Sequence, residues 1–115
     1  MKRGEVYVAV IEPRSGSEQR GKRPVVIVSH DGMNSTPNWN SLVVVPVSSS
    51  SLQGRRVPTV VTLPTGTAGL TLESLAVCHQ VTTLDRRKLS ERLGELPADL
   101  LAEVGEALKR ALALT

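Results

Sequence analysis

The chain has 115 residues, of which 40% are hydrophobic and 22% charged, and its formal net charge is +3 at pH 7. This length predicts one domain, residues 1–115, with its own core, and no segment approaches the ~18 apolar residues of a membrane span. The single cysteine, Cys78, excludes an intramolecular disulfide and a thiolate zinc site, and it favours a reducing, cytoplasmic setting.

Short β-strands are predicted at residues 5–11, 24–28, 42–47, 58–63 and 75–81. The first alternates in hydrophobicity, as a half-buried strand does. The second begins at Pro24, where no ladder donor is lost, and Pro46 indicates an edge or a bulge in the third. Residues 13–22 and 30–40, which are rich in turn-forming residues, are predicted to be loops.

The C-terminal element is predicted to be an amphipathic helix of about four turns. Pro97 occupies the first helical position, and apolar residues follow at a spacing of four: Leu100, Val104, Leu108 and Leu112. Residues 85–96 fit either a short helix or another strand. Short, closely connected strands followed by one helix predict a mostly β or α+β domain, and they favour a small closed barrel over an open sheet.

Positive charge is concentrated in the first half of the chain. The basic residues there are Lys2, Arg3, Arg14, Arg20, Lys22, Arg23, Arg55 and Arg56, and the acidic ones are Glu5, Glu12, Glu18 and Asp31. This half is therefore where we expect an anionic partner such as a nucleic acid. Within it, the stretch GSEQRGKRPVVIVS sets a dense polar loop directly against a core strand, either as plain solvated surface or as a rigidly held site.

Four segments taken in order, RGEVYVAVIEP, GSEQRGKRPVVIVS, LVVVPVSS and GLTLESLAVCHQVTTLD, resemble the MazF/PemK family of toxin endoribonucleases. The resemblance implies an SH3-like β-barrel, a homodimer, and a cognate MazE/PemI-like antitoxin that blocks the RNA groove. It also implies cleavage of single-stranded RNA, such as mRNA, without a metal or another cofactor. The ribose 2′-hydroxyl is then the nucleophile, and the products carry 2′,3′-cyclic phosphate and 5′-hydroxyl ends.

The resemblance assigns catalytic roles to Arg23 and Ser48. Arg23 matches the family's arginine before proline, and a guanidinium is suited to stabilising charge on phosphate oxygens. Ser48 matches the family's catalytic Thr or Ser at the end of the third strand, although any serine of residues 48–51 offers a hydroxyl. From the residues alone, Arg23 is as readily a solvated arginine that closes a hairpin, and the serines are as readily a polar turn.

The general base is left open between Glu18 and His79. Glu18 fits orientation of Arg23 somewhat better than a base, because a carboxylate so close to arginine has its pKa lowered. His79 stands where PemK-type members carry an acid, and Ser17 stands where they carry a histidine. Histidine titrates near neutral pH, so His79 could replace the base, or it could be a strand-end histidine with no role.

The predicted RNA-binding residues, besides a tryptophan, are Arg14, Gln19, Arg20, Lys22, Arg55, Arg56 and Gln80. Trp39, in a loop, is expected to stack on a base, unless it plugs the barrel or lies at the dimer contact. Two other functions remain open, because the same barrel serves toxins that bind DNA gyrase and an RNA-binding barrel need not cleave. The pairing of Arg23 with Ser48 favours the endoribonuclease.

Overall fold

The structure, a computed structural model, describes residues 1–11, 21–49 and 57–115. Its strands are β1 (Glu5–Ile11), β2 (Gly21–Ile27), β3 (Ser41–Ser48), β4 (Val60–Leu63), β5 (Ser74–Val77), β6 (Thr82–Asp85) and β7 (Leu89–Glu95). Its helices are α1 (Asp31–Asn34) and α2 (Ala98–Ala111), with short 3-10 turns η2 (Thr67–Gly69), η3 (Cys78–Gln80) and η4 (Arg86–Lys88). Within these described ranges, no helix has the length and apolar character needed to cross a membrane.

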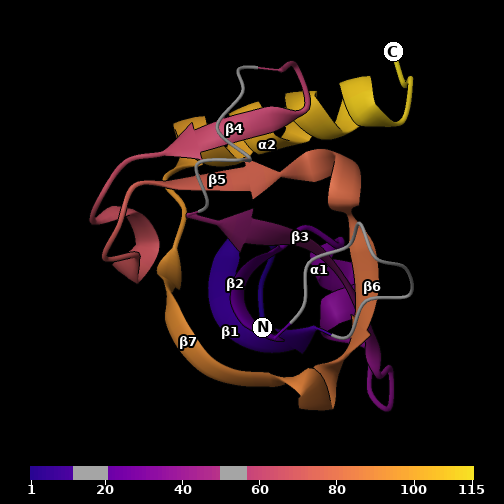
Figure 1. The fold of residues 1–115 in the computed structure, drawn as a ribbon. Coiled ribbons are helices and arrows are strands. Elements are labelled where there is room, and N and C mark those ends of the chain that lie inside the picture. The colour runs from indigo at the N-terminus through magenta and orange to yellow at the C-terminus, as the bar shows by residue number, and fades with distance from the viewer. Residues whose placement is uncertain (12–20, 50–56) are drawn as a thin grey trace.

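The strands pair antiparallel in the order β4-β5-β3-β2-β1-β7. β3 is central, because one edge pairs with β2 while the other edge pairs first with β6 and then with β5. The sheet curls around β1 and β2, and α2 packs against β4 (Figure 1). The predicted mostly β class with a C-terminal helix is confirmed, and in the described residues the curled sheet has no ladder joining β4 to β7.

A backbone contact between η2 and β7 bridges this gap instead. A Cβ added to Gly94 would lie 2.6 Å from the carbonyl carbon of Ala68, and one added to Gly69 would collide with the Leu93 carbonyl. Gly69 also has φ +79°, in the left-handed region that favours glycine. Only glycine at both positions lets the two backbones approach so closely, and the contact fixes η2 and the residues that follow it against β7.

The strands β2 and β3 are buried on both faces. Val26 and Val45 belong to a cluster that α2 covers with Val104 and Ala107, while other side chains of β2 and β3 belong to a second cluster. This second cluster consists of Ala9, Val25, Ile27, Leu42, Val44 and Leu89. Burial on both faces explains why these strands are continuous apolar runs in the sequence rather than alternating ones.

Several predicted boundaries are corrected. β1 has the predicted bounds, but β2 begins at Gly21, so Lys22 lies in a strand rather than in the loop predicted for residues 13–22. The predicted strand at residues 75–81 stops at Val77, and the unpredicted β6 follows it. The ambiguous segment 85–96 forms η4 and the strand β7, and α1 falls within the loop predicted for residues 30–40.

Pro46 lies in the central strand and not at an edge. The Val43 carbonyl accepts a hydrogen bond from the Val28 N–H at 2.9 Å, so the odd-numbered backbone groups of β3 face β2 and the even-numbered ones face the other edge. On that other edge, the pairing with β6 ends at Val44 and the pairing with β5 begins at Val47. The missing N–H of Pro46 therefore falls where β3 changes partners, and no ladder bond is lost.

The helix α2 follows the predicted amphipathic pattern. The helix runs from Ala98 to Ala111, so it begins one residue later than predicted. Pro97 is its N-cap residue and not its first helical residue. Val104 is fully buried and Leu108 is packed against the same cluster. Leu112, the last apolar position of the pattern, is the C-cap residue and is 54% exposed.

We expect Gly94→Ala to lower the free energy of unfolding by about 3 kcal/mol, because the new methyl group collides with backbone that cannot move away cheaply. The control is Gly66→Ala. Gly66 has φ +87°, and an added Cβ there would have no atom within 4 Å. Gly66→Ala should therefore lower the free energy of unfolding only through its left-handed backbone, by about 1 kcal/mol. Urea denaturation measures both. An equal or smaller loss for Gly94→Ala would show that the η2–β7 approach does not constrain the barrel.

Candidate functional site

The strand register brings Arg23 and Ser48 to the same end of the sheet. Val25 of β2 pairs with Pro46 of β3, and the same antiparallel register, continued by two residues, sets Arg23 opposite Ser48. The two residues that the sequence assigns to catalysis therefore occupy neighbouring positions where β2 begins and β3 ends.

Arg23 lines a small open pocket of about 120 Å³. The other lining residues are Pro24, Val47 and Ser49 from β2, β3 and the end of β3, and Leu70, Thr71, Leu72 and Ser74 from the segment between η2 and β5. Pockets that enclose a whole small molecule measure about 300–1,000 Å³. This one suits a single group of a larger ligand, such as one phosphate or one base.

The guanidinium of Arg23 has a buried donor that is not satisfied. Its Nε is buried and has no hydrogen-bond partner in the part of the chain that the structure describes. Most buried donors in folded proteins are paired, and an unpaired one costs about 1–3 kcal/mol. A positively charged group with an unpaired donor, in a pocket, is an arrangement that a phosphate oxygen would satisfy.

Ser48 and Ser49 differ in exposure. Ser48 ends β3 and is only 3% exposed, whereas Ser49 is exposed and lines the pocket with Arg23. The other two serines of the predicted set, at positions 50 and 51, lie outside the described residues. Ser49 is therefore a second candidate, beside Ser48, for the hydroxyl that would hold a phosphate oxygen.

His79 is not brought into the Arg23 pocket. It is exposed in η3, and its Nδ1 lies 2.8 Å from Oγ1 of Thr59. η3 runs beside the part of β3 between Val44 and Val47, where the pairing partners change. At the rise of a strand, this places His79 about 7–10 Å along the sheet from Ser48.

Gln80 and Lys22 keep features that fit their predicted contact with RNA. Oε1 of Gln80 is buried and, like Nε of Arg23, has no hydrogen-bond partner among the described residues. Lys22 is exposed at the start of β2, next to Arg23. The remaining predicted site residues, Arg14, Glu18, Gln19, Arg20, Arg55 and Arg56, lie outside the described residues, and their roles stay predictions.

Trp39 is held at the far end of β3 from Arg23. Its side chain is 45% exposed, so it does not plug the barrel, and its carbonyl accepts hydrogen bonds from Nη2 and Nε of Arg86 at 3.1 and 3.3 Å. Trp39 lies two residues before the first residue of β3, and the strand spans about 23 Å to Ser48. Within one protomer, a base stacked on Trp39 therefore cannot belong to the nucleotide held by Arg23.

Cys78 is a core residue without nucleophilic character. It is fully buried, and burial raises the pKa of its thiol to about 12, so the reactive thiolate is not formed near neutral pH. Among the described residues, no three His, Cys, Asp or Glu side chains gather as they do around a metal ion.

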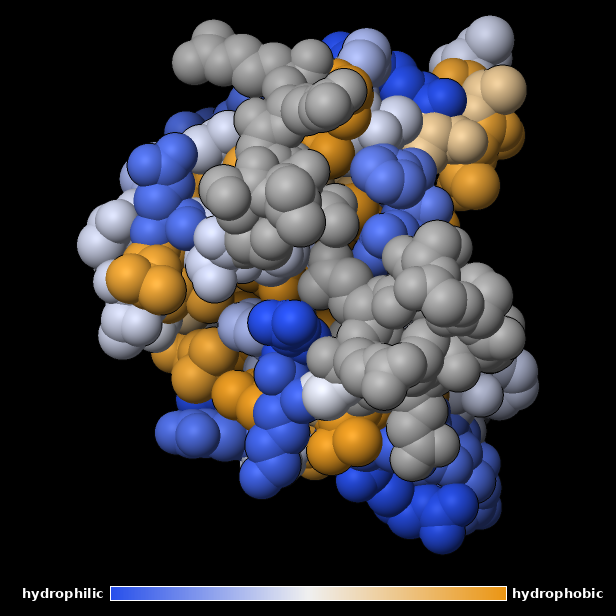
Figure 2. All heavy atoms as spheres, in the orientation of Figure 1, coloured by the Kyte–Doolittle hydropathy of each residue, from blue (hydrophilic) through white to orange (hydrophobic). Residues whose placement is uncertain are grey.

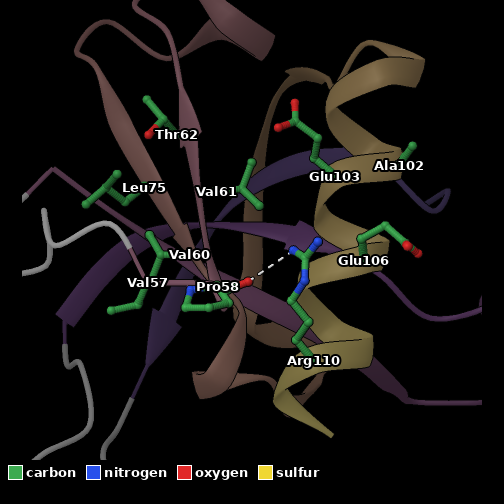
Figure 3. Close-up of a pocket in the computed structure, with 10 residues that line it drawn as sticks. All are labelled: Val57, Pro58, Val60, Val61, Thr62, Leu75, Ala102, Glu103, Glu106 and Arg110. Atoms are coloured by element: carbon green, nitrogen blue, oxygen red, sulfur yellow. Dashed lines mark hydrogen bonds between the residues drawn. The ribbon is translucent and has the colours of Figure 1, made fainter. Parts of the chain in front are cut away.

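A larger groove, of about 650 Å³, lies between α2 and β4 (Figure 3). Apolar side chains such as Val57 and Val60 line the strand side, while Glu103 and Glu106 lie on the helix side. Arg110 donates a hydrogen bond through Nη1 to the Pro58 carbonyl at 3.3 Å across the groove. Two carboxylates beside apolar surface suit a protein partner better than the phosphates of RNA.

The comparisons with known proteins decide the family. A sequence model described as PemK-like, MazF-like toxin of type II toxin-antitoxin system matches residues 2–112. The chain belongs to this toxin family. Endoribonuclease EndoA of Bacillus subtilis (strain 168) is 32% identical to this PemK/MazF-like chain over 114 residues, which are 99% of this chain and 96% of that protein.

Solved structures of MazF-like proteins match over nearly the whole chain. MazF (Form-I) from Deinococcus radiodurans has a TM-score of 0.81 and 29% identity, and the match covers 99% of this chain and 97% of that one. An endoribonuclease in complex with its cognate antitoxin, from Mycobacterial species, has a TM-score of 0.80 and 25% identity, covering 100% and 97%. The predicted family is confirmed, and these names agree with the predicted activity.

We expect Arg23→Met to keep or raise the free energy of unfolding, by up to about 1 kcal/mol, because it removes an unpaired buried donor and keeps the aliphatic stem. The matched control is Arg92→Met. Nε of Arg92 donates to Oε2 of Glu5 at 2.6 Å, and Glu5 is only 8% exposed, so this control leaves a buried carboxylate without its partner and should lower stability. Thermal and urea unfolding measure both variants. A loss for Arg23→Met as large as that of the control would mean that Nε of Arg23 is paired in solution.

Proposed function

We propose that this chain is a toxin endoribonuclease that cleaves single-stranded RNA, such as mRNA, at Arg23. The family membership and the name of the B. subtilis relative support the reaction class. The observation that carries the assignment of the site is the buried, unpaired Nε of Arg23, a residue that lines a pocket at the end of β3. A cytoplasmic location follows from this substrate.

In the proposed reaction, the ribose 2′-oxygen attacks the adjacent phosphorus while the bond from phosphorus to the 5′-oxygen breaks. The products are a 2′,3′-cyclic phosphate and a 5′-hydroxyl, whose oxygen takes up a proton from water as the bond breaks. Negative charge builds on the non-bridging oxygens, and a permanently charged guanidinium fixed in a strand stabilises it without reorganising. Ser48 or Ser49 would donate to the same oxygens, and Lys22 would contribute long-range attraction. This chemistry needs no metal ion.

The proton of the 2′-hydroxyl has to pass to a base, and the two candidates are His79 and Glu18. Glu18 also fits the orientation of Arg23. It lies five residues before Arg23 in the chain. His79 is separated from the Ser48 position along the sheet and is hydrogen-bonded to Thr59. His79→Ala distinguishes the two, because a base contributes about 10²–10⁴-fold to the rate and shapes its pH profile.

We expect Arg23→Lys and Arg23→Met to reduce cleavage of a mixed RNA pool about 10²–10³-fold, as removal of a fixed transition-state donor does elsewhere. The neighbouring exposed cation provides the control, and Lys22→Met should cost only a few-fold through weaker attraction. The assay contains EDTA, and mapping of RNA ends should find cyclic phosphates and 5′-hydroxyls. Cleavage by Arg23→Met within a few-fold of wild type would remove Arg23 from the site, and activity that needs added magnesium would refute metal-free cleavage.

We also propose a cognate antitoxin as a partner. Relatives of this chain have been solved as complexes with antitoxins, one from Mycobacterial species and one named MazE-MazF from D. radiodurans. The positive charge predicted around Arg23 would attract an acidic peptide as it attracts phosphates, so the antitoxin would occupy the same surface as RNA.

The second proposed partner is another copy of the chain, docked on the groove between α2 and β4. The helix carries Glu103 and Glu106 towards its middle and Lys109 and Arg110 in its last turn. A twofold axis that sets two α2 helices antiparallel brings the acidic part of each helix to the basic end of the other. It also covers the apolar strand side of the groove, which includes the exposed Val57.

Light scattering at micromolar concentration should give twice the 12.3 kDa mass of one chain. Ala102 lines the groove and is exposed on α2, so Ala102→Arg should produce a folded monomer by placing a bulky charge in the contact. Ala98→Arg, on the first turn of the same helix and outside the groove, is the control and should remain a dimer. A wild-type protein that is monomeric, or an Ala102→Arg variant that stays dimeric, would contradict this interface.

A further inference from the structure

We propose that Thr71 and Leu72 form the base-selecting wall of the Arg23 pocket, and that they help decide which nucleotide is accepted beside the scissile phosphate. The inference rests on the proposed endoribonuclease function and adds residues that give the pocket its specificity. The segment GLTLES, which contains both residues, carries no cationic or aromatic residue that would mark it as an RNA contact in the sequence.

The pocket has two chemically different walls. One is the start of β2 and the end of β3, which contribute Arg23 and the exposed Ser49, the residue after β3. The other is the segment between η2 and β5, where Leu70 is buried but Leu72 is 61% exposed. Figure 2 shows hydrophobic surface exposed over this segment, at the left of the view. A ligand in the pocket meets a cation on one side and an aliphatic side chain on the other.

The second wall is held rigidly. The Gly66 N–H donates to the Leu70 carbonyl at 2.8 Å, and the turn is locked against β7 by the close approach of Gly69 to Leu93. Beyond the turn, Oγ of Ser74 donates to the Leu72 carbonyl at 2.9 Å. An exposed leucine on a fixed backbone loses little entropy when a ligand packs on it, which makes it an effective contact.

The chemistry of this wall fits a base and does not fit the RNA backbone. Neither leucine nor threonine offers a positive charge, and the exposed Glu73 between Leu72 and Ser74 repels phosphates. The aliphatic side chain of Leu72 can pack on the flat face of a base, and the hydroxyl of Thr71 can both donate to and accept from a base edge. With a phosphate on Arg23, the base next to it is the part of the RNA that reaches this wall.

The test maps every cleavage site in a randomised RNA pool for the wild type, Leu72→Ala, Thr71→Ala and Leu114→Ala. Leu114 is the matched control, because it is also an exposed leucine, at 60%, in the tail after α2. We expect Leu72→Ala to cut the best wild-type site about 10-fold less efficiently, mainly through a higher KM, and to broaden the preference at one position beside the cut. Thr71→Ala should change preference at the same position, Leu72→Met should restore most of the efficiency, and Leu114→Ala should match the wild type.

The outcomes separate the two proposals. If the wild type cuts no RNA in the pool, the proposed function fails and this inference falls with it. If the wild type cuts and Leu72→Ala keeps the same base preference at every position, the inference alone is overturned. The same holds if Leu72→Ala changes only the affinity for an antitoxin, because Leu72 would then contact a protein and not a base. Unchanged thermal unfolding of all variants excludes a folding defect as the cause.

Discussion

The approach of η2 to β7 at Gly69 and Gly94 is the contact on which the geometry of the site depends. The ladders leave β4 and β7 unpaired with each other in the described residues, so this contact of backbone on backbone joins the two ends of the curled sheet. It also fixes the start of the segment that runs to β5, and that segment is one wall of the Arg23 pocket. The contact between the two ends of the curled sheet and the shape of the pocket therefore depend on the same two glycines.

The other wall shows how the core and the chemistry are connected. Arg23 stands two residues before Val25 and four before Ile27, which are fully buried, so its backbone is held by a strand that continues into the core. Its buried, unpaired Nε lowers the stability of the fold, and a purely structural role for Arg23 does not explain this cost. A donor held unpaired in advance is what stabilisation of a phosphorane requires, since the protein then does not reorganise as charge develops.

The sequence predicted most where the signal is local. The alternation in β1, the apolar runs of β2 and β3, and the period of α2 all reflect burial, and each was located to within a few residues. β6 was missed because Thr82 and Thr83 interrupt any apolar pattern, and its place is set by pairing with β3. The catalytic roles of Arg23 and Ser48 were predicted from the resemblance to the family. Thr71 and Leu72 line the pocket because segments distant in the sequence meet there, and no local sequence pattern indicates this. The sequence likewise does not show that Trp39 lies at the other end of β3 from Arg23, and its predicted stacking on a base stays a prediction.

The most direct test of the Arg23 site is the ¹H–¹⁵N resonance of its Nε–H group, assigned by its disappearance in Arg23→Lys. The toxin is titrated with an RNA that carries a 2′-deoxy sugar at the cleavage position, so that it binds without being cut. We predict that this resonance shifts as the RNA saturates the protein, and that its exchange with water slows, because the donor becomes paired with a phosphate oxygen. A resonance that keeps its position and exchange rate at saturating RNA would contradict the role given to Arg23.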